Sequence, residues 1–254
     1  MKKFVIGNLK MNLLSPLERE KYFEFFDKEK ENKNLENVEV ILCPPFVHLE
    51  AFNEWKNEKV SLGAQNIFPE MKGSYTGEIS PAMVKNLGCD YVILGHSERR
   101  RYFLEKNEEI NMKALAALKI GLRPVICVGE SQTEKENQAT MQVITKQVKE
   151  CLFEISRTKA EKIIIAYEPV WAVGTDIVPT ANEIMEAKVL IRKILVGMFG
   201  KNYAEKVSIL YGGSVNTRTA KEVCVEPGMD GALIGRESLT PYEFLRIAEI
   251  INNN

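Results

Sequence analysis

Short apolar, β-branched runs recur along the whole chain, and most are continuously apolar rather than alternating. Continuous runs are typical of strands that are covered on both faces in a parallel sheet. Their spacing of roughly 20–45 residues suits a strand followed by a crossover helix and is too long for hairpins. The predicted strands are Phe4–Gly7, Val38–Cys43, Val60–Ala64, Tyr91–Gly95, Pro124–Val128, Ile163–Tyr167, Val207–Tyr211 and Ala232–Gly235.

The segments between these runs carry helix start and stop signals. Ser15–Glu18 offers an N-cap serine, a first-turn proline and a capping-box glutamate. Ser80 precedes a proline in the same way, and Gly88 supplies a stop about one short helix later. Thr180 and Glu183 form another capping box at the head of an amphipathic run. The chain therefore alternates strand and helix.

Eight strand–helix units in succession form either a closed (β/α)8 barrel or an open doubly wound sheet. Eight is the barrel number, and no G-x-G-x-x-G fingerprint follows the first strand, so the pattern favours the barrel. The chain has 254 residues without a Pro/Gly/Ser-rich tract or a charge block. Barrels of this class often run to about 250 residues as one unit. We therefore expect one domain over residues 1–254.

Composition excludes some classes of partner. The 34 basic and 35 acidic residues are interspersed and give a net charge of −1, which argues against a nucleic-acid surface. The five cysteines lack metal-like spacing, and Cys43, Cys127 and Cys224 sit in or beside apolar runs. Buried reduced thiols in a cytoplasmic protein are the expectation. We find no signal-peptide core and no apolar stretch long enough to span a bilayer.

Polar residues cluster where the predicted strands end. In α/β barrels the chemistry lies at the carboxyl ends of the strands, because the following loops converge there. Taken alone, Lys10 is typical of a solvated surface lysine, and His96 fits a hydrogen-bonded structural histidine as well as a functional one. Glu168 differs, because a carboxylate at the end of an apolar strand must be paired, protonated or functional. The candidate segments are Asn8 and Lys10, Gln65 and Asn66, Gly95–Arg100, Glu168–Thr175, Tyr211–Val215 and Gly235–Leu239.

These segments carry motifs of a known family. They are Gly7–Asn12, Gly63–Asn66, Gly73–Glu78, Leu94–Arg100, Ala166–Thr175 and Tyr211–Val215. With them the chain resembles the triosephosphate isomerases along its entire length. The resemblance implies a single-domain (β/α)8 TIM barrel that interconverts dihydroxyacetone phosphate and D-glyceraldehyde 3-phosphate through an enediolate, in glycolysis and gluconeogenesis. It implies no cofactor and no metal.

The resemblance also implies roles for individual residues. Glu168 matches the base that moves a proton between adjacent carbons, and His96 matches a neutral electrophile at the substrate oxygens, as is known for the family. Lys10 matches the cation that stabilises the enediolate, and Asn8 a residue that positions the substrate. We expect Ser97 to cap a helix that starts just after His96. A helix N-terminus at this place would disfavour a protonated imidazole, which agrees with the role implied for His96.

Phosphate recognition in this family uses backbone N–H groups at glycine-rich turns and helix N-termini. Gly174, Ser214 and Gly235 match the phosphate-contacting positions, and the backbone N–H of Arg236 is a further candidate donor. The segment Pro169–Thr175 reads as a lid with hinges at both ends. Such a lid excludes water from a reactive intermediate.

The chain departs from the family pattern at three places. Leu9 stands where the family often has Trp, and Asp176-Ile177-Val178-Pro179 replaces the commoner Gly-Lys start. Arg236-Glu237 replaces the usual Gly-Ala pair beside the phosphate site. We expect the Arg236 side chain to point away from the ligand. We also expect Glu98 and Arg99 to pair with each other and support their loop.

Other readings of the same residues remain open at this point. A Schiff-base aldolase would use Lys10, the only candidate lysine at an inner strand end, and a metal-dependent epimerase would need more than the two histidines present. A non-catalytic barrel is a third reading, against which Glu168, His96 and Lys10 argue. By resemblance, Gly73–Glu78 is the loop that inserts into a second copy in a homodimer, with Thr76 near its tip.

Overall fold

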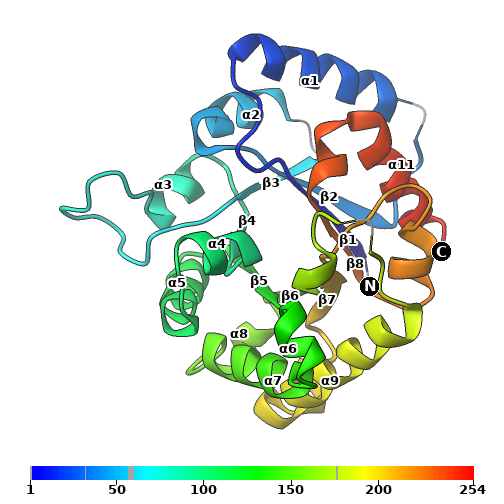
Figure 1. Cartoon of the computed structure of the whole chain (residues 1–254). Helices are drawn as coiled ribbons and strands as arrows, with labels where there is room; N and C mark the ends of the chain where they lie inside the picture. Colours follow the sequence, from blue (N-terminus) through cyan, green and yellow to red (C-terminus); the bar gives the residue numbers. More distant parts are fainter. Residues whose placement is uncertain (1, 32, 57–59, 176) are drawn as a thin grey trace.

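Eight parallel strands close into a barrel in sequence order, and each hydrogen-bonds to the next (Figure 1). This computed structural model describes residues 2–31, 33–56, 60–175 and 177–254. The strands are β1 Lys3–Asn8, β2 Val38–Cys43, β3 Val60–Ala64, β4 Tyr91–Leu94, β5 Arg123–Val128, β6 Ile164–Tyr167, β7 Ser208–Tyr211 and β8 Gly231–Ile234. The predicted (β/α)8 barrel is confirmed.

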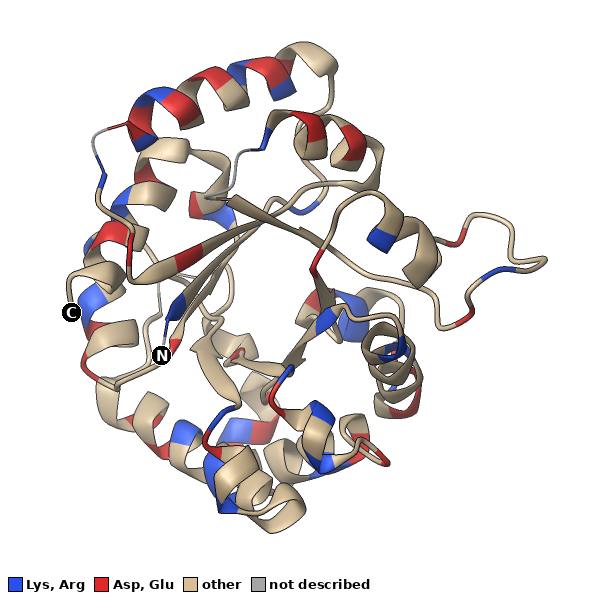
Figure 2. Cartoon of the chain, turned by 180° about the vertical axis from the view of Figure 1, so that it is seen from behind, with Lys and Arg blue, Asp and Glu red and all other residues tan. Residues whose placement is uncertain are grey.

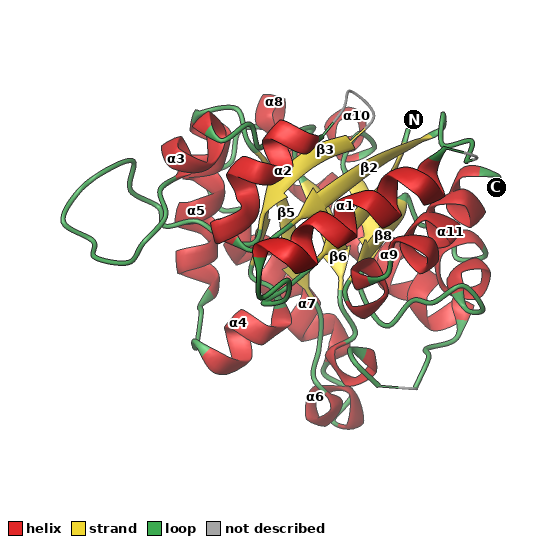
Figure 3. Cartoon of the chain, turned by 90° about the horizontal axis from the view of Figure 1, so that it is seen from above, coloured by secondary structure: helices red, strands yellow, loops and turns green. Residues whose placement is uncertain are grey.

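Helices surround the strands on the outside of the barrel (Figure 3). The longer helices are α1 Pro16–Lys30, α2 Leu49–Trp55, α3 Pro81–Asn86, α4 Ser97–Tyr102, α5 Asn107–Lys119, α6 Gln132–Glu136, α7 Thr140–Cys151, α9 Ala181–Phe199 and α11 Pro241–Asn252. Short helical turns are η1 Phe46–His48, α8 Arg157–Ala160, η2 Val170–Ala172, α10 Lys201–Ala204, η3 Lys221–Val225 and η4 Arg236–Leu239.

The predicted strand ends differ from the observed ones by a residue at most. β4 ends at Leu94 and not at Gly95, because Gly95 has φ +68°, a left-handed conformation that cannot continue a strand. β8 begins one residue earlier than predicted, at Gly231, which is paired with Phe4 of β1. That pairing closes the barrel between the first and last strands.

The helix caps predicted at Ser15, Ser80 and Thr180 form as expected. The Ser15 hydroxyl accepts a hydrogen bond from the N–H of Glu18, and Ser80 accepts one from Met83. Thr180 and Glu183 make the reciprocal capping box at the start of α9. These short-range bonds fix where each helix begins, so the lengths of the loops between strands and helices follow from local sequence.

Strand side chains fill two apolar layers, which explains why the strands are continuously apolar. One layer packs between the strands and the surrounding helices. The other is a separate cluster of alternating strand residues inside the barrel: Phe4, Ile6, Ile41, Cys43, Tyr91, Ile93, Val125, Cys127, Ile164, Ala166, Leu210 and Leu233. All five cysteines are buried and unpaired, as expected.

The outside of the barrel is mixed in charge. Figure 2 shows acidic and basic positions alternating over the outer helices rather than gathering on one element. One long loop, between β3 and α3, extends away from the barrel and contains Gly73–Glu78 (Figure 1). No helix in the described part of the chain has the length and apolar character needed to cross a membrane.

Candidate active site

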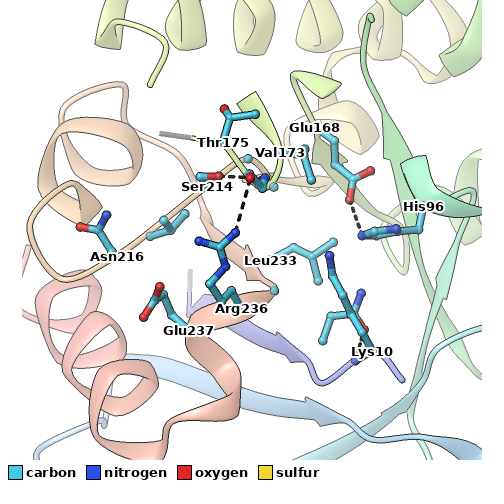
Figure 4. Close-up of a pocket in the computed structure, with 16 residues that line it drawn as sticks. Lys10, His96, Glu168, Val173, Thr175, Ser214, Asn216, Leu233, Arg236 and Glu237 are labelled. Carbon is cyan, nitrogen blue, oxygen red and sulfur yellow. Dashed lines mark hydrogen bonds and ion pairs between the residues drawn. The ribbon is translucent and has the colours of Figure 1, made fainter. Parts of the chain in front are cut away.

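A pocket opens at the carboxyl ends of the strands, where the loops after β1, β4, β6, β7 and β8 meet (Figure 4). The catalytic and substrate-binding residues implied by the resemblance all line it, whereas the candidates Gln65 and Asn66 do not. The implied residues are Asn8, Lys10, His96, Glu168, Gly174, Ser214, Gly235 and Arg236. Barrel closure brings them together because parallel strands deliver their following loops to one face.

Glu168 follows β6 and is 2% exposed. Its Oε2 accepts a hydrogen bond from the backbone N–H of Ser97 at 2.9 Å, and its Oε1 lies 3.2 Å from Nε2 of His96. Within the described ranges no group donates a well-aligned hydrogen bond to Oε1. One carboxylate oxygen is therefore anchored, and the other remains available to a ligand.

His96 is the N-cap residue of α4, and its Nδ1 accepts a hydrogen bond from the N–H of Glu98 at 3.2 Å. A ring nitrogen that accepts carries no proton, so this network assigns a neutral imidazole with its proton on Nε2. The expectation that Ser97 caps this helix is wrong. Ser97 is the first helical residue, and its N–H instead donates to Glu168.

Lys10 has φ +52°, a left-handed conformation that is unusual for a residue with a side chain. Backbone strain of this kind often occurs at functional sites. Its Nζ lies 2.5 Å from Oε1 of Glu98, and the Gln65 amide donates to its carbonyl at 2.8 Å. The Asn8 amide oxygen accepts from the backbone N–H of Lys10 at 3.1 Å. The lysine is thus fixed from three sides.

The expected pair between Glu98 and Arg99 does not form. Glu98 contacts Lys10, and Arg99 lies 3.4 Å from the buried carboxylate of Glu105. No sequence pattern indicates the contact between Glu98 and Lys10, because the two residues come from different strand–helix units. Their proximity follows from closure of the barrel.

Glycine and hydroxyl groups line the other end of the pocket. The N–H of Gly174 donates to Oγ of Ser214 at 3.0 Å, and the N–H of Ser214 donates to the carbonyl of Ala172 at 3.1 Å. A Cβ at Gly235 would lie 3.1 Å from Cε of Lys10, so the lysine stem passes close to the backbone there. This end offers small residues and polar donors suited to an anion.

The predicted lid begins with a turn, η2, whose Trp171 indole N–H donates to Oε1 of Glu130 at 2.8 Å. Glu130 is 1% exposed and also accepts from the Tyr167 hydroxyl, and burial raises the pKa of its carboxyl group. Nζ of Lys135 lies 3.3 Å from the centre of the Trp171 ring. Sequence reasoning missed Glu130 and Lys135. Asp176 in the far hinge lies outside the described residues.

The expectation that the Arg236 side chain points away from the ligand site does not agree with the structure. That side chain lies along the pocket wall, and its guanidinium donates to the carbonyl of Gly174 in the lid at 3.4 Å (Figure 4). The reason is positional, because Arg236 is the first residue of η4, directly after the strand end at the pocket mouth.

Comparison with known proteins shows which family has a sequence like that of this chain. The sequence profile described as triosephosphate isomerase matches residues 3–251. The triosephosphate isomerase of Dictyoglomus turgidum is 44% identical over 96% of this chain and 97% of its own length. That of Carboxydothermus hydrogenoformans is 43% identical over 98% of both chains. That of Dictyoglomus thermophilum is 47% identical over 86% of this chain and 88% of its own. The chain belongs to the triosephosphate isomerase family.

Proposed function

We propose that Glu168, His96 and Lys10 together carry the interconversion of dihydroxyacetone phosphate and D-glyceraldehyde 3-phosphate, the reaction of the family to which the chain belongs. Because the chain belongs to this family, we favour this reaction over those of an aldolase or an epimerase. The observation that carries the assignment is the 3.2 Å approach of the Glu168 carboxylate to the proton-bearing nitrogen of His96 in a buried pocket.

The three groups have separable roles. Glu168 removes the proton from the carbon beside the substrate carbonyl and returns it to the neighbouring carbon, a contribution of about 10²–10⁴-fold. The Nε2–H of neutral His96 donates to the oxygen on which negative charge develops. Lys10 supplies a positive charge to the same enediolate. Each preorganised donor of this kind contributes roughly 3–4 kcal/mol to the transition state.

The substrate phosphate would bind at the opposite end of the pocket, to N–H groups of Gly174, Ser214, Gly235 and Arg236. The phosphate takes no part in bond making, but its binding energy can drive closure of the lid over the reacting carbons. Closure excludes water and strengthens the electrostatic contacts to the enediolate. Asn8 would hold Lys10 in place, since its side chain bonds the Lys10 backbone.

The decisive test is Glu168→Gln, assayed in both directions with triose phosphates. The amide keeps the size of the side chain and removes the base, so we expect kcat to fall by about 10²–10⁴-fold with a small change in KM. Glu237→Gln is the matched control, because it removes a carboxylate that also lines the pocket. A Glu168→Gln enzyme that keeps activity within tenfold of wild type would remove Glu168 as the base.

We also propose that the chain is a homodimer assembled through Gly73–Glu78. This loop is exposed along its whole length, and apolar side chains beside the site are bare, with Met11 at 89% and Leu14 at 83% exposure. Met11 directly follows Lys10 and Leu14 lies four residues after it, so a second copy packed on them would steady the segment that carries the lysine. Thr76→Arg should shift sedimentation from dimer to monomer and lower activity, whereas Thr158→Arg on α8 should do neither.

We place the enzyme in the cytoplasm. Five free, buried cysteines suit a reducing compartment, where thiols stay unpaired. Cell fractionation followed by activity measurement tests this placement, and recovery of the activity outside the cytoplasmic fraction would contradict it.

A further inference from the structure

The phosphate end of the pocket contains a cation that the family pattern does not call for, namely Arg236. Its guanidinium contacts the carbonyl of Gly174 at 3.4 Å, while the N–H of the same glycine bonds Ser214 Oγ at 3.0 Å. The guanidinium therefore contacts the same glycine that bonds Ser214, and Gly174 and Ser214 both match phosphate-contacting positions of the family. Figure 4 shows the guanidinium of Arg236 directed toward the part of the pocket that contains Ser214.

Charge is unevenly divided within the pocket. Its described lining residues include two cations, Lys10 and Arg236, and two carboxylates, Glu168 and Glu237. Lys10 is engaged by the Glu98 carboxylate, close to His96 at the end where Glu168 lies. Within the described part of the chain, the polar contact of the Arg236 side chain is with a neutral carbonyl. The positive charge at the lid end of the pocket thus comes from Arg236.

We propose that the Arg236 side chain binds the substrate phosphate directly, exchanging the Gly174 carbonyl for phosphate oxygens when the ligand enters. Arg236 then acts as a binding residue for the phosphate, in addition to its backbone N–H. This inference rests on the proposed function, because it takes the ligand to be a phosphate ester. It goes beyond that function in making a side chain, rather than backbone groups alone, responsible for phosphate affinity.

The exchange is favoured by the chemistry of the groups. A separation of 3.4 Å is long for an N–H···O bond, so little is lost when the carbonyl is released. A phosphate dianion accepts two parallel bonds from the planar guanidinium, and such charge-assisted bonds are about twice as strong as neutral ones. The side chain is exposed, so it can turn toward the ligand without unpacking the core.

The test uses Arg236→Met, which keeps much of the length of the side chain and removes its charge and donors. We measure kcat/KM for D-glyceraldehyde 3-phosphate and for unphosphorylated D-glyceraldehyde, and the affinity for inorganic phosphate by titration calorimetry. We expect the ratio of the two kcat/KM values and the phosphate affinity each to fall about tenfold or more. Arg236→Lys, which keeps the charge, should recover part of both losses.

Arg218→Met is the matched control. Arg218 is exposed and lies in the loop after β7 that also contains Ser214, but it does not line the pocket. The substitution removes the same charge from the neighbourhood, so any general electrostatic attraction for phosphate would show equally there. Equal losses in the two variants would overturn the proposal.

Two further outcomes also decide against it. If Arg236→Met slows both substrates alike and leaves phosphate affinity unchanged, the side chain is a lid contact only. If it changes neither quantity, the backbone groups bind the phosphate unaided. The calorimetric titration needs no turnover, so it still reports on Arg236 even if the wild-type enzyme should fail to isomerise triose phosphates.

Discussion

At the scale of single residues, the position of Glu168 depends on glycines that leave room for it. A Cβ at Gly212 would lie 2.8 Å from Cγ of Glu168 and 3.3 Å from the carbonyl of Tyr167. A Cβ at Gly129 would lie within bonding distance of the Glu168 carbonyl oxygen, which is impossible without moving the backbone. Glu168 is thus held in a slot made by residues without side chains.

Gly212→Ala should move Glu168 without removing it. The added methyl group leaves the chain folded, because the nearest atom belongs to a side chain that can shift. A misplacement of about 1 Å can lower the rate about 10²-fold, so we expect kcat to fall by one to two orders of magnitude. Steady-state kinetics measures this fall.

The control for this prediction is Gly197→Ala in α9, where an added Cβ meets nothing within 4 Å. That change should stabilise the helix by about 0.5–1 kcal/mol and leave kcat alone. A Gly212→Ala enzyme with wild-type kcat would show that Glu168 does not need this slot.

At the scale of elements, the lid is tied at its start to two neighbouring segments. Trp171 donates to Glu130 after β5, and Lys135 of α6 lies over the Trp171 ring. Nζ of Lys135 also lies 2.8 Å from Glu183, the capping residue of α9 that follows the lid. The predicted lid segment, α6 and α9 therefore share one polar cluster, and a movement of that segment would have to rearrange it.

Through Glu130, this cluster makes the free energy of unfolding of the protein depend on pH. Burial raises the pKa of Glu130 above its ordinary value of 4.5, although bonds from Trp171 and Tyr167 act in the opposite direction. The folded state binds this proton more tightly than the unfolded chain, so the contribution of Glu130 to stability is full below pH 4.5. It is lost as the pH rises through the raised pKa. In the folded protein, burial therefore disfavours the ionised form of Glu130 relative to its protonated form.

Glu130→Gln removes that titration while keeping an acceptor for Trp171. The stability of wild type relative to this variant should decline as the pH rises above about 4.5 and through the raised pKa, by about 1.4 kcal/mol for each unit of pKa elevation. Urea unfolding at several pH values measures the difference. Glu186→Gln, at an exposed position on α9, controls for loss of a charge. A difference that grows with pH would contradict the assignment.

At the scale of the whole molecule, the first and last strands meet along one seam. β1 pairs with β8 from Phe4 to Gly7, and α11 packs beside α1. Because the two ends of the chain complete one another, we propose that residues 1–254 form a single domain that unfolds in one cooperative transition. The seam is where a local change has the largest effect on the barrel.

Gly231→Ala should weaken this seam severely. Gly231 has φ +139°, and a Cβ there would overlap the backbone carbonyl of Phe4, an atom that cannot give way. Strain and overpacking together lead us to expect a loss of about 3 kcal/mol or more in the free energy of unfolding. Gly121→Ala, at φ +83° in open space, isolates the torsional part and should lose only about 1 kcal/mol.

Chemical denaturation of both variants, followed by circular dichroism, provides the measurement. Equal losses at Gly231 and Gly121 would mean that the seam accommodates a side chain. A wild-type unfolding curve with two separate transitions would contradict the single domain.

The sequence by itself determined the elements and the fold of this protein. Strands, caps and the eightfold alternation depend on neighbouring residues, and so does the grouping of Asn8, Lys10, His96 and Glu168 at strand ends. Local hydrophobic period and short-range capping bonds are legible in a linear chain, because the interacting groups lie within one or two turns of each other. The barrel was therefore predictable from this pattern, whereas the roles of the site residues are implied by the resemblance to a known family.

Only the tertiary structure decided which side chains face one another. Three contacts join residues from different strand–helix units. They are the ion pair of Glu98 with Lys10, the hydrogen bond from Trp171 to Glu130, and the contact of Arg236 with the Gly174 carbonyl. Such partners depend on side-chain direction at the point where loops converge, and hydrophobic patterning carries no information about it. The physical reason is barrel closure, which turns distant positions into neighbours.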